Sequence, residues 1–254
     1  MFMNIGFIGT GKITNACVRY LAGKGHNIIV TERNTGISRA LVDTFDDVKI
    51  GSLDLIQGKS DVIFIALMES MIEDVLGSMS FKKDQTIISF VLGVDLNRLH
   101  SLCAPATDIA ITIPLPMIEH GKCPLPVYPN CEVLKKIFGE DNLLINLSNE
   151  ASLIPYFAAT ALLSSSLAQL ETAKKWLHTH LDEEGAAERY LISLMSGTYS
   201  SLKLDGRGRI NEALDSLSTK GGLNAQLRDH MKQEGTEKTL YKGLLKLGER
   251  LNLD

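Results

Sequence analysis

The residue spacing with the clearest chemical meaning lies near the N-terminus, in the sequence Gly-Phe-Ile-Gly-Thr-Gly-Lys-Ile-Thr of residues 6–14. It follows a short apolar run and precedes a helical pattern, which is the context that a dinucleotide-binding glycine loop requires. Gly9 allows a tight turn, and Gly11 lets the backbone approach a pyrophosphate at the helix N-terminus. Thr14 takes the third glycine position and is still small enough for fairly close packing. We therefore expect Gly9, Thr10, Gly11, Lys12 and Ile13 to bind a dinucleotide.

Two charged residues follow the second apolar run and bear on which dinucleotide is bound. Glu32 stands where an acidic side chain would bond the adenosine ribose hydroxyls of NAD. Arg33 stands where a guanidinium would meet the 2′-phosphate of NADP, although a solvated turn residue would look the same. The run Arg33-Asn-Thr35 favours NADP, and NAD stays open as the second cofactor.

Apolar runs of strand length alternate with helical patterns through the first 150 residues. Strands are expected at 3–8, 26–31, 48–51, 61–67, 85–91 and 108–113, with further candidates at 124–128 and 142–147, and helices at about 12–23 and 37–46. Alternation of this kind is typical of a parallel sheet covered by helices on both faces. The fold class expected for residues 1–150 is therefore α/β, an N-terminal Rossmann domain with a doubly wound sheet.

The pattern becomes purely helical after Asn149-Glu150. Helices are expected at 151–180, 183–202, 209–217, 223–234 and 237–251. The first is poor in charge, and its leucines recur at three- and four-residue spacing, so it needs an apolar partner. We expect residues 151–254 to form an all-helical dimerisation and substrate domain, in a homodimer or higher homo-oligomer.

Composition narrows the class of protein. The chain has 254 residues, 44% of them hydrophobic, and a net charge of −4, which argues against nucleic acid as a partner. The four cysteines fit no metal-binding spacing and are expected as small buried side chains, and no metal is expected. The chain starts without a basic leader, and no uninterrupted apolar run approaches about 18 residues, so we expect no membrane span and a cytoplasmic protein.

The chain also resembles the pyrroline-5-carboxylate reductase family, nearly from end to end. Four stretches carry the resemblance: residues 6–13, 60–66, 87–93 and 218–224, the last reading Ser-Thr-Lys-Gly-Gly-Leu-Asn. The resemblance implies an NAD(P)H-dependent oxidoreductase that reduces the C=N bond of a small imino acid, as in proline biosynthesis. It implies cofactor contacts from Ala66, Leu67 and Met68, and a substrate site that includes Thr219, Gly221, Gly222 and Asn224.

Several positions depart from the family pattern. Met68-Glu69 replaces a Lys-Pro pair, Leu115 replaces an asparagine, and Leu223 and Asn224 replace two threonines. Asn224 could bond a substrate carboxylate or imine nitrogen, or cap a helix N-terminus. His120, after the sixth strand, could protonate the product amine or be an exposed loop residue. These departures indicate a divergent member with a reshaped substrate pocket.

Two alternatives remain. The missing family residues are also what a catalytically inactive dinucleotide-binding regulator would show. A 3-hydroxyacid-type dehydrogenase is a weaker reading, because the residues around Lys174 and Lys175 lack the lysine motif of those enzymes.

Overall fold

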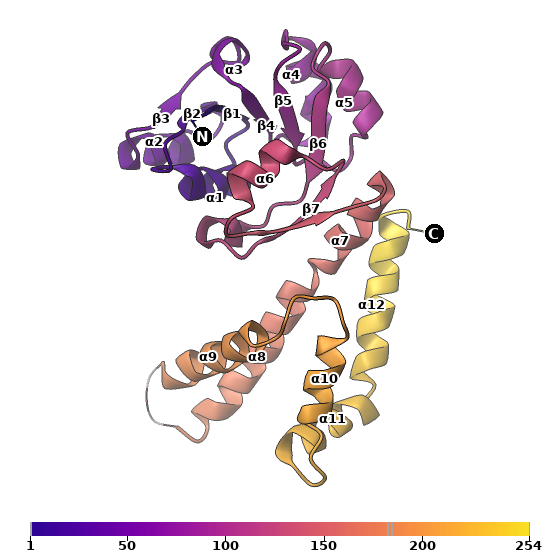
Figure 1. The fold of residues 1–254 in the computed structure, drawn as a ribbon. Helices are drawn as coiled ribbons and strands as arrows, with labels where there is room; N and C mark the ends of the chain where they lie inside the picture. Colours follow the sequence, from indigo (N-terminus) through magenta and orange to yellow (C-terminus); the bar gives the residue numbers. More distant parts are fainter. Residues whose placement is uncertain (1, 182, 184, 254) are drawn as a thin grey trace. The chain divides into compact units, whose positions relative to one another are not determined.

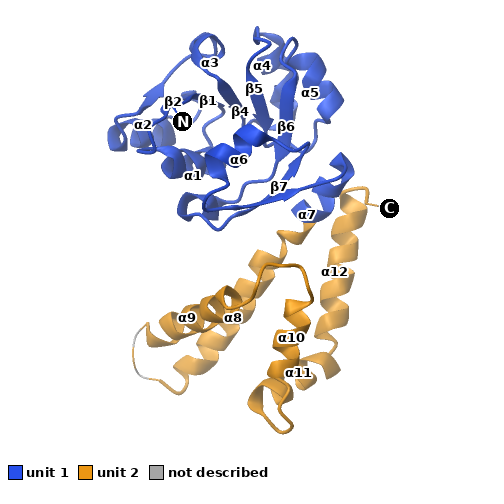
Figure 2. Ribbon diagram, viewed as in Figure 1, with its two compact units in different colours: residues 1–157 blue, residues 158–254 orange. Residues whose placement is uncertain are grey.

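The computed structural model describes residues 2–181, 183 and 185–253. The chain forms two compact units, residues 1–157 and residues 158–254 (Figures 1 and 2). The first unit is an α/β sandwich, and the described part of the second contains helices and no strand, so the expected fold class is confirmed.

One sheet of eight strands forms the centre of the first unit, in the order β3-β2-β1-β4-β5-β6-β7-β8. The strand order reverses between β1 and β4, as in a doubly wound Rossmann sheet. The strands are β1 (Asn4–Ile8), β2 (Asn27–Val30), β3 (Val48–Ile50), β4 (Val62–Ile65), β5 (Thr86–Ser89), β6 (Asp108–Thr112), β7 (Pro124–Tyr128) and β8 (Leu143–Asn146).

The sheet departs from the expected parallel arrangement at one place, because β7 runs antiparallel to β6. The connection between them, residues 113–123, contains only the short 3₁₀ helix η2 (Pro116–His120). A parallel pair needs a crossover of a dozen or more residues, usually an α-helix, and this segment is too short for one. The other neighbouring strands are parallel.

Alternate residues of the strands build a separate core on each face of the sheet. One core holds Phe7, Phe64 and Phe138, with Phe7 and Phe64 stacked at 4.7 Å between ring centroids. Helices α1 (Lys12–Leu21), α2 (Thr35–Thr44) and α6 (Glu132–Phe138) cover this face. The other core is rich in isoleucine and lies under α3 (Leu53–Lys59), α4 (Ile72–Gly77) and α5 (Leu96–Leu102).

The second unit contains α8 (Leu162–His178), α9 (Ala186–Ser200), α10 (Arg209–Ser216), α11 (Leu223–Gln233) and α12 (Thr236–Arg250). The single helix expected over 151–180 is wrong. A 3₁₀ turn η3 (Glu150–Ser152) and a short helix α7 (Leu153–Ala159) precede α8. At the break, the amides of Ala161 and Leu163 bond carbonyls three residues back, so the α-helical ladder is interrupted there.

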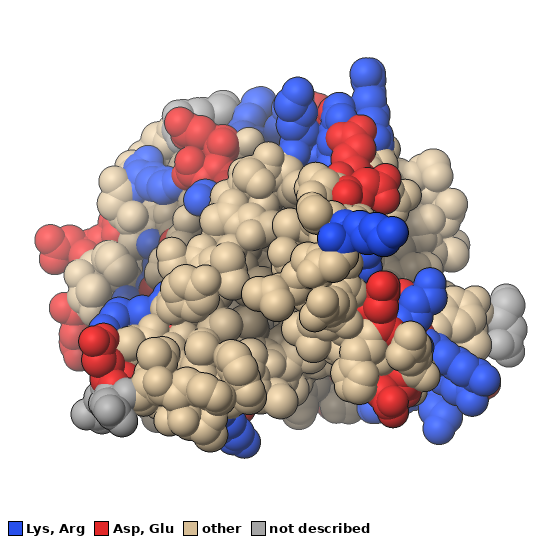
Figure 3. Space-filling model, turned by 90° about the horizontal axis from the view of Figure 1, so that it is seen from below, with Lys and Arg blue, Asp and Glu red and all other residues tan. Residues whose placement is uncertain are grey.

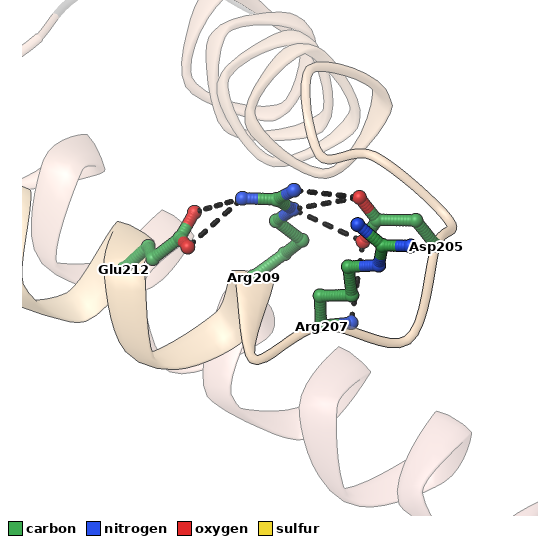
Figure 4. A network of polar contacts seen from close by, with 4 residues as sticks. All are labelled: Asp205, Arg207, Arg209 and Glu212. Atoms are coloured by element: carbon green, nitrogen blue, oxygen red, sulfur yellow. Dashed lines mark hydrogen bonds and ion pairs between the residues drawn. The ribbon is translucent and has the colours of Figure 1, made fainter.

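An ion-pair network closes the loop between α9 and α10 (Figure 4). The Arg209 guanidinium lies 2.6 Å from Asp205 Oδ2 and 2.6 Å from Glu212 Oε2. Gly206 and Gly208 have φ of 68° and 73°, values that favour glycine. The network thereby fixes the start of α10, the helix that leads into the loop 217–222.

Exposed apolar side chains are frequent in the helical unit. Leu167, Trp176 and Tyr190 are 60–64% exposed, and one face of the molecule is largely uncharged, with charged side chains towards its margin (Figure 3). By length and composition alone, Glu150–His178 passes as a membrane span, with a mean hydropathy of 1.4 over an 18-residue window, which is weak evidence for one. The expectation of no membrane span depended on unbroken apolar runs, and this segment has none; sparse charge is what raises its hydropathy. The same property suits a helix that packs against another subunit.

Candidate dinucleotide and substrate sites

The glycine loop after β1 is held rigidly against the neighbouring strands. Gly9 has φ of +98°, and a Cβ there would lie 2.2 Å from the carbonyl oxygen of Ala66. Its N–H donates to Thr31 Oγ1 at 2.9 Å, and the Thr10 hydroxyl donates to the Thr31 carbonyl. The Thr14 hydroxyl donates to the Gly9 carbonyl at 2.7 Å, so the residue at the third glycine position ties the loop to α1.

Gly11 has the opposite environment, because a side chain added at this position would point into open space. A Cβ on Gly11 would meet no atom of the described chain within 4 Å. Gly11 is the N-cap of α1; no side chain caps that helix, and its first turn holds no acidic residue. The helix therefore presents unpaired amides and a positive dipole end, the arrangement that binds a phosphate group.

A cavity of about 550 Å³ opens beside this loop, at the carboxyl ends of β1, β2 and β4. It is lined by Thr10, Gly11, Arg33, Asn34, Thr35, Ala66, Leu67 and Met68. The structure thus brings together six of the expected cofactor residues, from three separate loops. Glu32 is not among the lining residues, and its carboxylate lies 3.5 Å from the Arg39 guanidinium.

The start of α2 adds to the charge character of this cavity. The Asn34 side chain caps α2 by accepting the Ile37 N–H at 3.2 Å, and no acidic residue lies in the first turn. Arg33 and the amide end of α2 therefore face the same space as the glycine loop, and both favour an anion.

A second cavity, of about 630 Å³, lies at the carboxyl ends of β4 and β5 and shares Met68 with the first. Its lining residues are Met68, Glu69, Ser70, Ile72, Glu73, Gly93, Val94, Asp95 and Arg98. Glu73 accepts a two-pronged bond from the Arg98 guanidinium, and Asp95 caps α5 by accepting the Arg98 N–H at 2.7 Å. In the sequence, Glu69 is only a departure from the family pattern and Gly93 only part of a similar stretch; nothing in the pattern places either residue in a cavity.

The loop 218–222 of the helical unit also ends at an uncapped helix. Gly221 has φ of +77°, and the Gly222 N–H donates to the Thr219 carbonyl at 2.9 Å. Gly222 is the N-cap of α11, with no side-chain cap and no acid in the first turn. Arg228 donates to Ser218 Oγ at 2.8 Å and to the Leu214 carbonyl at 3.1 Å. These two hydrogen bonds connect α11 to the start of the loop and to α10.

The positions of Asn224 and His120 bear on the alternative roles that the sequence left open for each of them. Asn224 is exposed and is the second residue of α11, so its reading as the helix N-cap is wrong. His120 ends η2, which packs against α1, where Glu119 lies 3.9 Å from Arg19. His120 is exposed and does not line either cavity of the first unit.

The cysteines behave as buried apolar side chains. All four are buried and unpaired, and burial raises the pKa of the Cys103 thiol to about 12. In the described part of the chain, no group of three or more His, Cys, Asp or Glu residues is placed to hold a metal ion.

Comparison with known proteins begins with a family model that covers the N-terminal part. Residues 4–93 match the model of the family described as NADP oxidoreductase, coenzyme F420-dependent. These residues run from β1 through the loop after β5, and so include the glycine loop and both cavities' main lining segments. A search of curated protein sequences gave no match.

Solved structures resemble the whole chain. A pyrroline-5-carboxylate reductase from Coxiella burnetii superposes with a TM-score of 0.81 and 17% identity, covering 98% of this chain and 97% of that one. The Streptococcus pyogenes 1-pyrroline-5-carboxylate reductase gives 0.80, 18% identity and 98% of both chains. The Plasmodium falciparum pyrroline carboxylate reductase, solved with NADP bound, gives 0.79, 14% identity, and 98% and 97%. The expected resemblance is thus confirmed as one of fold, and the chain shares the pyrroline-5-carboxylate reductase fold over nearly its whole length.

Proposed function

We propose that this chain is an NAD(P)H-dependent reductase that transfers hydride to the C=N bond of a small imine or imino acid. The observation that carries the proposal is the cavity formed by the loops after β1, β2 and β4. It combines an uncapped helix end, an open glycine and an arginine, the set of groups that a phosphorylated dinucleotide needs. The likeness of fold to imino-acid reductases supports the class of reaction.

The residues present fit a dinucleotide. The open space over Gly11 leaves room for a pyrophosphate beside the amides of Lys12 and Ile13. Ala66, Leu67 and Met68 would line the path towards the second cavity. When bound, the reduced dinucleotide supplies the hydride, while the protein contributes positioning and electrostatics.

NADP is the preferred cofactor in this proposal. Arg33 lines the cavity next to the N-terminal end of α2, which Asn34 caps and which holds no acidic residue in its first turn. The guanidinium and the positive end of the helix together suit a 2′-phosphate. Glu32, the residue that would favour NAD, lies beside Arg39 and is not among the lining residues. The NADP found in the Plasmodium falciparum structure agrees with this assignment.

The loop 219–222 is the proposed binding element for a substrate carboxylate. The backbone amides at the start of α11 can bind an anion without help from a side chain. Asn224 is exposed on the first turn of that helix and is proposed to contact the same substrate. A protonated imine is already electrophilic, so no strong general acid is obligatory, and the exposed His120 is not required as one.

The substrate is proposed to be more apolar than pyrroline-5-carboxylate. Leu223 is 84% exposed at the start of α11, where the family has a threonine, and its side chain cannot hydrogen-bond. A site that lacks designed polar contacts loses discrimination for the polar substrate. We expect kcat/KM for pyrroline-5-carboxylate below roughly 10⁴ M⁻¹s⁻¹, the low end of ordinary enzymes, and a higher value for an apolar cyclic imine. A role in proline biosynthesis would follow only from the opposite result.

The test is NADPH and NADH oxidation by the purified protein with a panel of cyclic imines, imino acids and 2-oxo acids. Turnover of an imine supports the proposal. Turnover confined to hydroxy or oxo acids would indicate a 3-hydroxyacid-type dehydrogenase. Tight dinucleotide binding without any turnover would indicate a catalytically inactive regulator.

We further propose that the protein is a cytoplasmic homodimer joined through the helical unit, since Leu167 and Trp176 of α8 are more than 60% exposed.

A further inference from the structure

The second cavity contains one carboxylate whose charge is not matched inside the described chain. Glu73 is paired with Arg98, and Asp95 accepts a backbone N–H as the cap of α5. Glu69 lines the same cavity, and among the described residues its carboxylate has no hydrogen bond or ion pair; only its backbone carbonyl is bonded, by the Ile72 N–H. Of the three carboxylates in this cavity, Glu69 alone is free to interact with a bound molecule.

The position of the Glu69 side chain depends on Gly93. A Cβ on Gly93 would lie 2.8 Å from Glu69 Oε1 and still closer to Oε2. The carboxylate therefore occupies the space that any other residue at position 93 would fill. Gly93 does not have the positive φ that favours glycine, so the close approach of Glu69 is what an added side chain would disturb.

The cavity is placed where the reacting end of a dinucleotide-dependent site should be. It borders the phosphate-binding cavity through Met68, which lines both. A dinucleotide spans the point where the strand order reverses, so its adenosine half lies over β2 and its other half extends towards β4 and β5. Glu69 begins the 3₁₀ helix η1 (Glu69–Met71) that follows β4, and Gly93 is in the loop after β5.

We propose that Glu69 is a specificity-determining residue that binds the cationic nitrogen of the substrate, an iminium ion or its amine product; this rests on the proposed function. An unpaired carboxylate attracts a cation, gains nothing from a neutral carbonyl and repels a carboxylate. Glu69 would therefore select protonated imines over ketones and oxo acids. It would also orient an imino acid with its nitrogen towards Glu69 and its carboxylate away.

The test compares a cation with a neutral molecule of similar size. Calorimetric titration of the NADP⁺-bound protein with pyrrolidinium and with cyclopentanol measures binding, and N-methyl-1-pyrrolinium reduction measures turnover. For Glu69→Gln, which keeps the size of the side chain, we expect about tenfold weaker pyrrolidinium binding, or 1.4 kcal/mol, and a similar fall in kcat/KM. Cyclopentanol binding should stay within twofold.

Two further variants separate the local effect from net charge and from misfolding. Asp74→Asn removes the same charge from an exposed position in the first turn of α4 and should leave pyrrolidinium binding unchanged. Gly93→Ala should displace the carboxylate and weaken pyrrolidinium binding as Glu69→Gln does, with the same melting temperature as the parent protein.

The inference is overturned if Glu69→Gln binds pyrrolidinium within twofold of the parent protein, or if the parent does not bind it. Reduction of imines by both proteins with equal kcat/KM would overturn the role of Glu69 and leave the proposed function intact. Glu69-dependent pyrrolidinium binding without turnover of any imine would support Glu69 as the cation site and contradict the proposed function.

Discussion

The substitution Gly11→Val tests the dinucleotide site most specifically, because the structure predicts lost binding with the fold retained. A Cβ at Gly11 meets nothing within 4 Å, and its φ of −99° and ψ of −170° are extended values that valine adopts readily. The branched side chain would fill the space left for a pyrophosphate. We expect the dinucleotide affinity to fall more than tenfold, or about 1.4 kcal/mol. The free energy of unfolding should change by less than about 1 kcal/mol, the usual scale of an N-cap substitution.

Gly9→Ala is the matched contrast within the same loop. Its Cβ would lie 2.2 Å from the Ala66 carbonyl oxygen at φ of +98°, so the loop or β4 must move. We expect a loss of at least about 2 kcal/mol in the free energy of unfolding, from backbone strain and the clash together. The assays are NADPH titration by fluorescence and chemical denaturation of both variants. Unchanged dinucleotide affinity in Gly11→Val would refute the assignment of the loop as the dinucleotide site. Equal free energies of unfolding for the two variants would contradict the claim that a side chain has room at position 11 and clashes at position 9.

Three other predictions concern the cofactor, the core and the assembly. Arg33→Ala should weaken NADPH binding at least about tenfold while NADH binding changes little, since only NADPH carries the 2′-phosphate; equal effects in the two titrations would show that Arg33 does not contact it. Phe64→Ala should lower the free energy of unfolding by about 3–5 kcal/mol, because Phe64 is fully buried between Phe7 and Phe138, and a loss under 1 kcal/mol by denaturation would contradict this packing. Sedimentation equilibrium at micromolar concentration should show a dimer, and Leu167→Arg on α8 should shift it to monomer; a monomeric parent protein would rule the dimer out.

Local sequence patterns predict much of the first unit. The apolar runs at 61–67 and 85–91 contain β4 and β5, and the spacing of Gly9 and Gly11 correctly predicts a loop followed by a helix. These features depend on neighbouring residues, so they can be read without knowledge of the fold. The helix expected at 37–46 starts two residues earlier, at Thr35, where the Asn34 side chain caps it.

Features that depend on distant contacts are not visible in the pattern. The antiparallel direction of β7 follows from the short connection before it, and the break before α8 follows from a change in hydrogen bonding near Ala161. The approach of Glu69 to Gly93 joins loops that follow two different strands. In the sequence, Glu69 stands out only because it departs from the family's Lys-Pro pair. Only the three-dimensional arrangement shows that its carboxylate lines a cavity without a partner.

Transfer of deuterium from the cofactor tests the central claim most directly. The protein would be incubated with NADPH carrying deuterium at C4 on one face, in turn on each face, and with an apolar cyclic imine, and the amine product would be analysed by mass spectrometry. We expect one of the two labelled cofactors to place a single deuterium on the carbon next to the nitrogen. An unlabelled product from both cofactors, or no product despite NADPH binding, would contradict it.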